Sequence, residues 1–560
     1  MFCKECYSHS YVLWIGIALA PFLLTCATQQ TPLRSFHVSP TANLPNYPMQ
    51  PVISEPVVQL SRYKNVQERP GQNPQLALAV AISGGGHRAG NLGLGALAAL
   101  EDVQIGDRHY NVLREVDYFS TISGGSLAAA AYLSCLYDYM EITGSPQGYS
   151  LRQALAGGET EVQSDTWPLY DPEWRQYAQH NYHKYLFQGL ITFLSFGSID
   201  RGDFLERAFD QKVLGREWRG KRLKAEKKTL EDATLTLGDV FIRPTSQRPV
   251  RLPYWFANAT VFENGAIFPF TPDILEQYRV IGYSHNLETV HLNPSDPDYD
   301  SVPLSVGLKA SATFPVAVPA TTLSSDYDPN NPYLHLYDGG MSDNTGVITA
   351  IRLLVQDPAP RKVLLVIDAF NGSQHPFSVK STSPTIPQFL WHWTKEIPLT
   401  SNHLRYREMP GWISLQYGED EGHSLDMLYL DFDLDLDDQA FRGYVDESGG
   451  QYTSQDYQAL APKEQAVFPP NAITRNPMVD TLTKPPLFAA GLLRTTLQPL
   501  MDLTPFSVLL QARSVSTTFS ITEEQQECLL EAGQMMVAWA THQGGMDHLA
   551  QWISSEGGPE

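Results

Sequence analysis

The chain has 560 residues, of which 42% are hydrophobic and 18% charged, so it can bury a large core and most of it should fold. Length alone predicts roughly two to four domains. The formal net charge of -22, from 39 basic and 61 acidic side chains with no dense run of Lys or Arg, argues against nucleic acid as a partner.

The first 26 residues resemble a targeting segment. An apolar run from Tyr11 to Cys26 follows a polar start that carries Lys4. This run is shorter than the roughly 20 apolar residues of a membrane span, and it fits the hydrophobic part of a signal peptide. Its end, Leu23-Leu24-Thr25-Cys26, resembles a bacterial lipobox, although Thr25 replaces the usual Gly, Ala or Ser. We expect residues 1–26 to be a signal peptide or an N-terminal lipoprotein or membrane anchor, on the periplasmic side or at the outer membrane; secretion is the alternative.

After the targeting segment the sequence offers a tether and few thiols. Residues 27–74 are rich in Pro, Gln, Asn and Ser, which predicts a proline-rich tether rather than part of a core. Cleavage at Cys26 would remove Cys3 and Cys6 and leave only Cys135 and Cys528 in the mature domain. That number excludes a disulfide-dense scaffold and offers no four-ligand zinc site. We therefore expect neither a metal nor a cofactor.

A glycine-rich loop follows the first predicted strand. The continuous apolar run Leu76 to Ile82 is typical of a strand buried on both faces of a parallel sheet, and a helical pattern covers about residues 91–103. The spacing Gly84-x-Gly86-x-x-Ala89 matches a dinucleotide fingerprint, but no second strand with a terminal acidic residue follows. The alternative is an oxyanion hole, in which consecutive glycines expose backbone N–H groups and Arg88 orients the loop or meets a phosphate.

A second strand-to-helix turn carries a candidate nucleophile. The strand Val116 to Ile122 is followed by Ser123-Gly124-Gly125 and by a small-residue helix at about Leu127 to Leu133. Such a turn lifts a serine hydroxyl out of the sheet, and the helix N-terminus favours the negative charge of acyl transfer. Thr121 stands where the pattern Gly-x-Ser-x-Gly has its first glycine, so a turn without chemistry is the alternative. The other nearby serines are expected to cap or pack: Ser83, Ser120 and Ser126.

Two motifs downstream complete a set. Ala310-Ser311-Ala312-Thr313-Phe314-Pro315 precedes Tyr337-Asp338-Gly339-Gly340. Together with the glycine loop and the Ser123 turn, these segments resemble, in type and order, the motifs of the patatin-like phospholipases over roughly Leu76 to Gly346. The family loop reads Gly-Gly-Gly-x-Arg-Gly; here Ala89 occupies the last glycine position and Gly90 follows.

This resemblance implies a three-layer α/β/α sandwich with a mainly parallel sheet over residues 75–370, interrupted by a helical insertion near 144–250. It implies a lipid acyl hydrolase of the phospholipase A or lysophospholipase type that acts on membrane lipid or lysolipid, with Ser123 as nucleophile and Asp338 as base. The oxyanion hole would comprise Gly84, Gly85, Gly86 and Arg88. Supporting glycines would be Gly124 and Gly125 at the elbow and Gly339 and Gly340 after the aspartate.

The insertion and the C-terminal region carry weaker signals. Tyr182 to Phe196 is strongly apolar and aromatic, which predicts either a membrane-facing lid or an ordinary buried helix. Lys362 to Asp368 predicts one more buried strand. The alternating run Leu430 to Asp438 predicts a half-exposed strand, with calcium binding as the alternative. Glu523 to Thr541 predicts a helix in the extension 371–560, whose role the sequence leaves open.

Two alternatives to the hydrolase stay open. An inactive, membrane-tethered binding or scaffold protein on the same fold is compatible with Thr121 and with the displaced loop glycine. An acyltransferase or thioesterase with the same serine and aspartate would differ only in the acyl acceptor or the leaving group.

Overall fold

The computed structural model describes residues 57–63, 72–105, 107–143, 145, 148–156, 182, 185, 201–226, 233–241, 251–314, 318–370, 424–431, 512, 515, 521–542 and 544–554. The chain divides into two units, Met1–Ser54 and Glu55–Glu560, and every described residue belongs to the second. The predicted targeting segment and most of the predicted tether lie outside the described residues. So does most of the alternating acidic run from Leu430 to Asp438.

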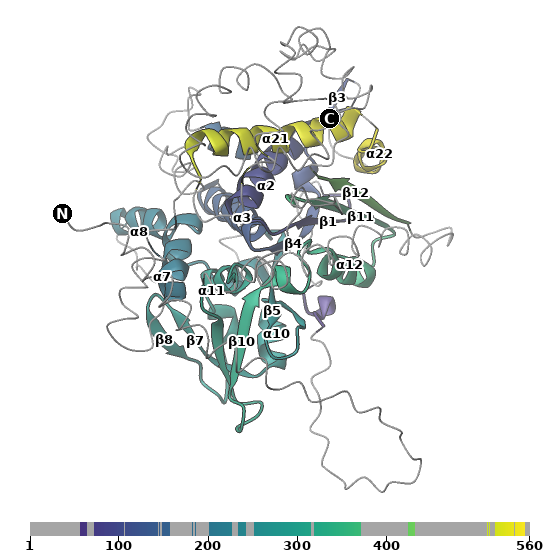
Figure 1. The fold of residues 1–560 in the computed structure, drawn as a ribbon. Helices are drawn as coiled ribbons and strands as arrows, with labels where there is room; N and C mark the ends of the chain where they lie inside the picture. Colours follow the sequence, from purple (N-terminus) through teal and green to yellow (C-terminus); the bar gives the residue numbers. More distant parts are fainter. Residues whose placement is uncertain are drawn as a thin grey trace, which may run out of the picture. The chain divides into compact units, whose positions relative to one another are not determined.

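A ten-stranded mixed sheet lies at the centre of the second unit (Figure 1). One half is parallel, in the order β12-β11-β1-β4-β5. These strands are Ser424–Leu430, Arg361–Ile367, Leu76–Ile82, Val116–Ile122 and Tyr254–Val261. Strands β1, β4 and β5 are buried along their whole length, as continuous apolar runs require. The strands predicted at Leu76 to Ile82 and Val116 to Ile122 are confirmed residue for residue.

The other half of the sheet is antiparallel, in the order β5-β10-β9-β7-β8. Its strands are β10 (Tyr333–Asp338), β9 (Thr321–Ser325), β7 (Val280–His285) and β8 (Glu288–His291). Strand β6 (Ile267–Pro269) pairs with β5 as a hairpin, and Gly265 takes the positive φ of its turn. A separate ribbon joins β2 (Val103–Ile105) to β3 (Arg108–Tyr110). The sheet therefore changes direction at β5.

Helices cover both faces of the parallel half (Figure 1), which confirms the predicted α/β/α layering. Helices α2 (His87–Leu100) and α3 (Gly124–Thr143) pack together on one side, and α12 (Val347–Gln356) packs on β1, β4 and β11 from the other. The remaining helices are α4 (Leu151–Ala156), α7 (Arg201–Ala208), the π-helix η4 (Phe209–Val213), α8 (Arg216–Ala225), α9 (Leu237–Phe241), α10 (Pro272–Gln277), α11 (Leu304–Ser311), α21 (Glu523–His542) and α22 (Asp547–Ser554). Short 3-10 turns lie at Leu60–Arg62, Val112–Arg114, Tyr299–Ser301 and Gly339–Met341.

Two helices begin earlier than the sequence predicted. Helix α2 starts at His87, directly after Gly86, whose φ of 60° lets the chain turn from loop to helix in one residue. Helix α3 starts at Gly124, immediately after Ser123, and extends to Thr143. The apolar periodicity missed these first turns because their residues are small or polar although they are buried.

The C-terminal helix α21 packs against α2, one of the helices that cover the sheet. It crosses α2 in close contact through glycine on both helices. A Cβ at Gly95 would lie 2.0 Å from the carbonyl oxygen of Leu530, and one at Gly533 would lie 2.2 Å from that of Leu92. Only glycine allows backbones to approach this closely. The predicted helix at Glu523 to Thr541 is therefore confirmed, and it covers the helix that follows the glycine loop.

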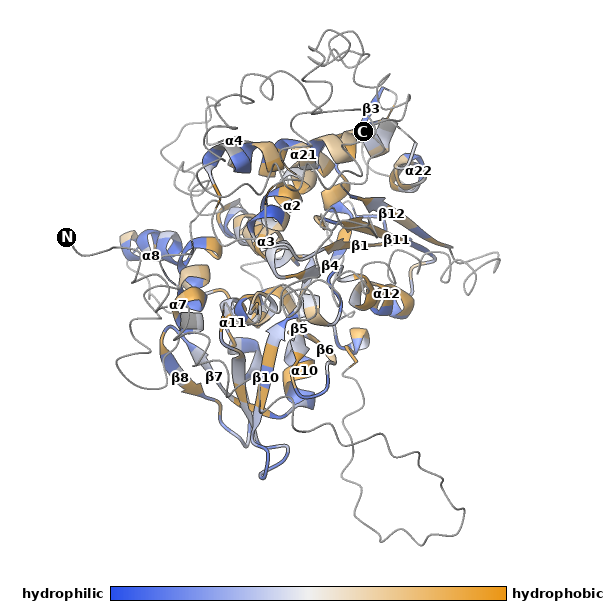
Figure 2. Ribbon diagram, in the orientation of Figure 1, coloured by the Kyte–Doolittle hydropathy of each residue, from blue (hydrophilic) through white to orange (hydrophobic). Residues whose placement is uncertain are grey.

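Helix α8 lies in the insertion and is largely hydrophilic, as its blue colour in Figure 2 shows. This agrees with the alternation of Arg, Lys and Glu in its sequence. Among the described residues, no helix is long and apolar enough to cross a membrane.

We predict that Gly533→Ala lowers the free energy of unfolding. Alanine favours a helix by about 1 kcal/mol over glycine, but here its Cβ meets the backbone of α2, so we expect a net loss of about 1–3 kcal/mol. Chemical denaturation followed by circular dichroism measures the change. The neighbouring exposed Gln534→Ala is the matched control and should stay within about 0.5 kcal/mol. A stabilised Gly533→Ala protein would contradict the close helix crossing.

Candidate active site

Ser123 is the single residue between the end of β4 and the start of α3, where the chain turns sharply. Its φ is 49°, in the left-handed region that non-glycine residues rarely adopt. Its side chain is half-buried, whereas those of Ser83, Ser120 and Ser126 are fully buried. A strained, accessible serine at a strand-to-helix turn is the arrangement that presents a hydroxyl to a substrate.

The two glycines after Ser123 allow its turn to touch the glycine loop. A Cβ at Gly124 would lie 1.9 Å from the carbonyl oxygen of Gly86. A Cβ at Gly125 would lie 2.4 Å from the carbonyl oxygen of Ile82. No side chain fits in either gap. The turns that follow the adjacent parallel strands β1 and β4 therefore lie backbone against backbone.

The three loop glycines differ in what their N–H groups do. Gly84 is buried and its N–H donates to the carbonyl oxygen of Asn344 at 2.9 Å. Gly85 and Gly86 are partly exposed, with φ of 155° and 60°. Within the described part of the chain, their N–H groups donate to no acceptor. Only Gly85 and Gly86 therefore have backbone donors available to a ligand.

Arg88 points away from any ligand position and into the protein. Its Nε donates to the carbonyl oxygen of Ala369 and its Nη1 to that of Val515, both at 2.7 Å. Burial lowers the pKa of Arg88 to about 10, and the nearby Asp368 opposes that shift. The guanidinium thus fixes the loop to the end of β11 and to the C-terminal region.

The insertion contributes to the surroundings of the glycine loop. Tyr182 is buried, and its ring stacks on that of His87 with 5.2 Å between centroids. It also meets Phe209 edge-on at 5.2 Å. Apart from Tyr182 and Tyr185, the apolar segment Tyr182 to Phe196 lies outside the described residues, so the membrane-facing lid and the buried helix both stay predictions.

Asp338 ends strand β10, which runs antiparallel to β5, and lies level with Ser123 at the end of β4. Strand β5 pairs with β4 so that Asn258 lies opposite Ile122, and with β10 so that Ala259 lies opposite Asp338. Because β10 is antiparallel to β5, its last residue arrives beside the residue that follows β4. A Cβ at Gly339 would lie 2.3 Å from the carbonyl oxygen of Asn258, so glycine is needed here for close packing.

Asp338 is buried, and its carboxylate has two partners. One is the Ser123 side chain, whose interaction with the carboxylate lowers its pKa. The other is the N–H of Gly340, 2.9 Å from Oδ1. Burial raises the pKa of Asp338 to about 6, while the Ser123 side chain and the Gly340 N–H act in the opposite direction. A carboxylate of this pKa is largely ionised at neutral pH and can still accept a proton from a serine hydroxyl.

The turn after Asp338 is built by Asp343. Its carboxylate accepts hydrogen bonds from the N–H groups of Thr345, Gly346 and Ile348. This holds Asn344 so that its carbonyl oxygen accepts from Gly84. The glycine loop, the serine turn and the aspartate turn are therefore connected by direct contacts.

Nothing in the sequence indicated one contact at the site, between Ser311 and the backbone of Ser123. The hydroxyl of Ser311, at the end of α11, accepts a hydrogen bond from the backbone N–H of Ser123 at 3.0 Å. The motif that contains Ser311 supported the family resemblance, but nothing in its residues indicated a partner 188 positions away.

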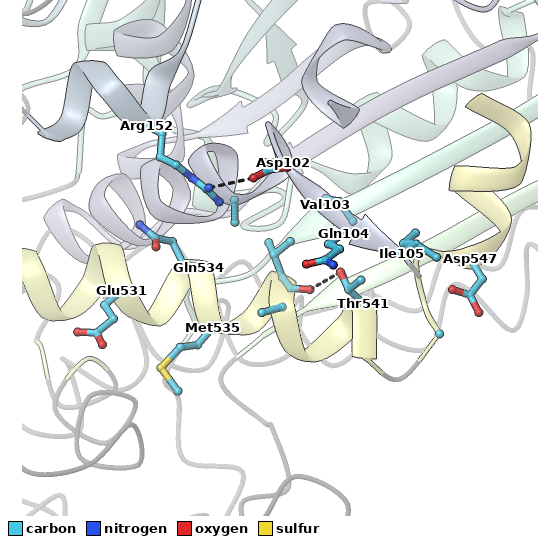
Figure 3. A pocket seen from close by; sticks show the side chains of 14 residues that line it. Asp102, Val103, Gln104, Ile105, Arg152, Glu531, Gln534, Met535, Thr541 and Asp547 are labelled. Carbon is cyan, nitrogen blue, oxygen red and sulfur yellow. Dashed lines mark hydrogen bonds and ion pairs between the residues drawn. The ribbon is translucent and has the colours of Figure 1, made fainter. Parts of the chain in front are cut away.

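The large pocket in Figure 3 lies elsewhere. Its volume is about 740 Å³, and it is lined by the end of α2, strand β2, Arg152, α21 and the start of α22. An ion pair between Arg152 and Asp102 borders it. None of the predicted site residues lines this pocket.

A comparison with protein families decides which fold this site belongs to. Residues 80–351 match the model of the family described as patatin-like phospholipase. This part of the chain is a patatin-like phospholipase domain. The matched region contains the glycine loop, the Ser123 turn and the Asp338 turn, whereas α21 lies beyond it.

Solved structures of cytosolic phospholipases are also similar to the chain. Human GIVD cytosolic phospholipase A2 matches with a TM-score of 0.36 and 12% identity, over 86% of this chain and 63% of that chain. Its complex with methyl gamma-linolenyl fluorophosphonate matches with a TM-score of 0.33 and 12% identity, over 86% and 59%. The chain therefore spans less than two thirds of the length of these proteins. No curated protein matches it significantly.

We predict that Asp338 makes the folded state pH-dependent. Because its pKa is raised on folding, its contribution to stability is present below about pH 4 and is lost as the pH rises through about 6. Relative to Asp338→Asn, wild type should lose roughly 2 kcal/mol of unfolding free energy between about pH 4.5 and about pH 8. Denaturant titrations at both pH values measure this difference.

The exposed Asp296→Asn provides the control, since a solvated carboxylate should leave the difference between the two pH values unchanged. If the unfolding free energies of Asp338→Asn and Asp296→Asn changed by the same amount between the two pH values, the pKa of Asp338 would not be raised in the folded protein.

Proposed function

We propose that the protein is a lipid acyl hydrolase of the phospholipase A or lysophospholipase type, which cleaves carboxylic esters through an acyl-enzyme on Ser123. The observation that carries the proposal is that the sheet places the buried Asp338 carboxylate beside Ser123, whose side chain lowers its pKa, inside a patatin-like phospholipase domain. The strained backbone of Ser123 supports it, as do the N–H groups of Gly85 and Gly86, which donate to no acceptor among the described residues.

In the first half of the reaction, Asp338 accepts the hydroxyl proton of Ser123 while Ser123 Oγ attacks the ester carbonyl carbon. The carbonyl oxygen becomes an oxyanion, and the N–H groups of Gly85 and Gly86 donate to it. The positive end of α3, directly after Ser123, favours the same charge. The C–O bond to the alcohol then breaks, and the alcohol leaves with the proton from Asp338.

The second half repeats these steps with water. Asp338 accepts a proton from water as it attacks the acyl-enzyme, and Ser123 recovers its proton when the fatty acid leaves. An alcohol or a thiol in place of water or of the leaving group gives the acyltransferase and thioesterase alternatives, which use the same residues.

The scheme assigns no role to histidine. The two histidines that a triad could recruit have other contacts: His335 Nδ1 lies 2.6 Å from Glu263 Oε1, and the ring of His87 stacks on Tyr182. The contact that orients the nucleophile is made by a carboxylate, which is the partner that a Ser-Asp dyad requires.

We predict that Ser123→Ala and Asp338→Asn abolish hydrolysis of a short-chain nitrophenyl ester and of phosphatidylcholine vesicles. Loss of the nucleophile should lower kcat on the order of a millionfold, and loss of the base by at least about a thousandfold. Spectrophotometry and chromatography of released fatty acid measure the two reactions.

Matched controls for these variants are Ser295→Ala and Asp296→Asn, both on an exposed loop, which should keep wild-type rates. Full activity in folded Ser123→Ala would move the nucleophile elsewhere. A folded wild type that hydrolyses neither substrate would favour the binding or scaffold protein instead.

The pH dependence of the reaction gives an independent check. Since only ionised Asp338 accepts a proton, kcat/KM should rise with pH and reach half of its plateau near pH 6. Initial rates on the nitrophenyl ester between about pH 4.5 and about pH 8.5 measure the profile. An acid limb at about pH 4 would indicate a solvated carboxylate rather than Asp338 as the base.

A further inference from the structure

A buried chain of hydroxyl groups lies beneath the candidate nucleophile. It begins at the Ser123 backbone N–H, which donates to Ser311 Oγ at 3.0 Å. Ser311 Oγ lies 2.9 Å from Ser126 Oγ, which lies 2.9 Å from Thr121 Oγ1. The chain ends at Trp255, whose indole Nε1–H donates to Thr121 Oγ1 at 2.8 Å. Its four side chains are at most 2% exposed: Thr121, Ser126, Trp255 and Ser311.

These groups come from four different elements that meet at the elbow. Thr121 belongs to β4, Ser126 to the first turn of α3, Trp255 to β5 and Ser311 to the end of α11. Each hydroxyl can donate one proton and accept another, so both links between the hydroxyls can form with the protons running in either direction along the chain. A buried network that is fully bonded holds its members in one arrangement.

The Ser123 backbone needs such support. Its φ of 49° costs on the order of 1–3 kcal/mol and persists only where the surroundings impose it. The backbone N–H of this strained residue donates a hydrogen bond to Ser311 Oγ. Without this acceptor the N–H would lose its hydrogen bond in a partly buried place, and the peptide unit could rotate.

We propose that Ser311 is a positioning residue for catalysis: through its hydrogen bond to the Ser123 N–H, backed by Ser126, Thr121 and Trp255, it holds the nucleophile in its reactive orientation. This inference rests on the proposed function. It adds a role for Ser311, whose hydroxyl binds the backbone N–H of Ser123.

The same network accounts for Thr121 at the position where an elbow usually has glycine. Its hydroxyl receives the Trp255 N–H and continues the chain to Ser126. Threonine at this position therefore supports the turn, and its presence does not indicate a lost active site.

The test compares Ser311→Ala with Ser305→Ala on the same helix. Both serines are fully buried, but the Ser305 hydroxyl donates to Glu206, away from the elbow. With the nitrophenyl ester, Ser311→Ala should lower kcat about tenfold, which is the loss expected from one buried hydrogen bond, and leave KM within about twofold. Ser305→Ala should lower thermal stability but keep kcat.

The pH profile separates positioning from a purely structural role. The Ser123 side chain lowers the pKa of Asp338, so a displaced Ser123 should move the acid limb of kcat/KM to higher pH in Ser311→Ala. Ser305→Ala should leave this limb in place. Thr121→Val, which keeps the shape and removes the hydroxyl, should shift the limb in the same direction, and Thr121→Ser should restore it.

A double-mutant cycle completes the test. Thr121 and Ser311 interact through Ser126. The fold-loss of kcat in the double variant should therefore be smaller than the product of the fold-losses in Thr121→Val and Ser311→Ala. If Ser311→Ala fails to fold, the pair Thr121→Val and Thr121→Ser decides. If wild type is active but the variants keep its kcat and pH profile, or if the two losses in kcat multiply fully, the positioning role of Ser311 is overturned and the proposed function stands. If wild type hydrolyses no ester, the proposed function is overturned together with the positioning role.

Discussion

The whole site depends on one steric constraint, the contact between two strand-to-helix turns that leaves no room for side chains. Strands β1 and β4 are adjacent and parallel, so the turns that follow them must lie side by side. Gly124 and Gly125 let the second turn rest on the backbone of the first. As a result, the N–H groups of Gly85 and Gly86 and the hydroxyl of Ser123 belong to neighbouring turns.

The change of strand direction at β5 supplies the third component. Strand β5 runs parallel to β4 and antiparallel to β10, which delivers Asp338 to the level of Ser123 although the two strands point in opposite directions. Burial then raises the pKa of Asp338, and the Ser123 side chain limits that rise. The topology thereby produces both the proximity and the proton affinity that a base needs.

The region beyond the matched family domain takes part in this arrangement. Helix α21 lies on α2 through glycine contacts, and the carbonyl oxygen of Val515 accepts a hydrogen bond from Arg88. The glycine loop is thus held from one side by the C-terminal region and from another by Asn344. This gives part of the extension 371–560 a structural role that its own sequence did not indicate.

The sequence predicted the features that local composition determines. The buried strands β1 and β4 and helix α21 were predicted because the periodicity of apolar residues is a local signal. Motif order gave Ser123 and Asp338 as candidates.

Contacts between distant residues were not predictable in this way. Arg88 was expected in an oxyanion hole, yet its guanidinium binds the carbonyl oxygen of a residue 427 positions away. Gly84 was expected there too, yet its N–H is used by Asn344. Ser311 likewise gained its partner only through the packing of α11 against the elbow. Residue type indicates what a group can bind, whereas the fold decides which partner is near.

The most direct test of the central claim is to identify the residue that carries the acyl group during turnover. Rapid acid quenching of the protein with a slowly hydrolysed nitrophenyl ester, followed by peptide mass spectrometry, measures this. We predict one acyl adduct on Ser123, formed at the rate of the initial burst and missing in Ser123→Ala. An adduct on another residue, or product release without any adduct, would contradict the assignment of Ser123 as the nucleophile.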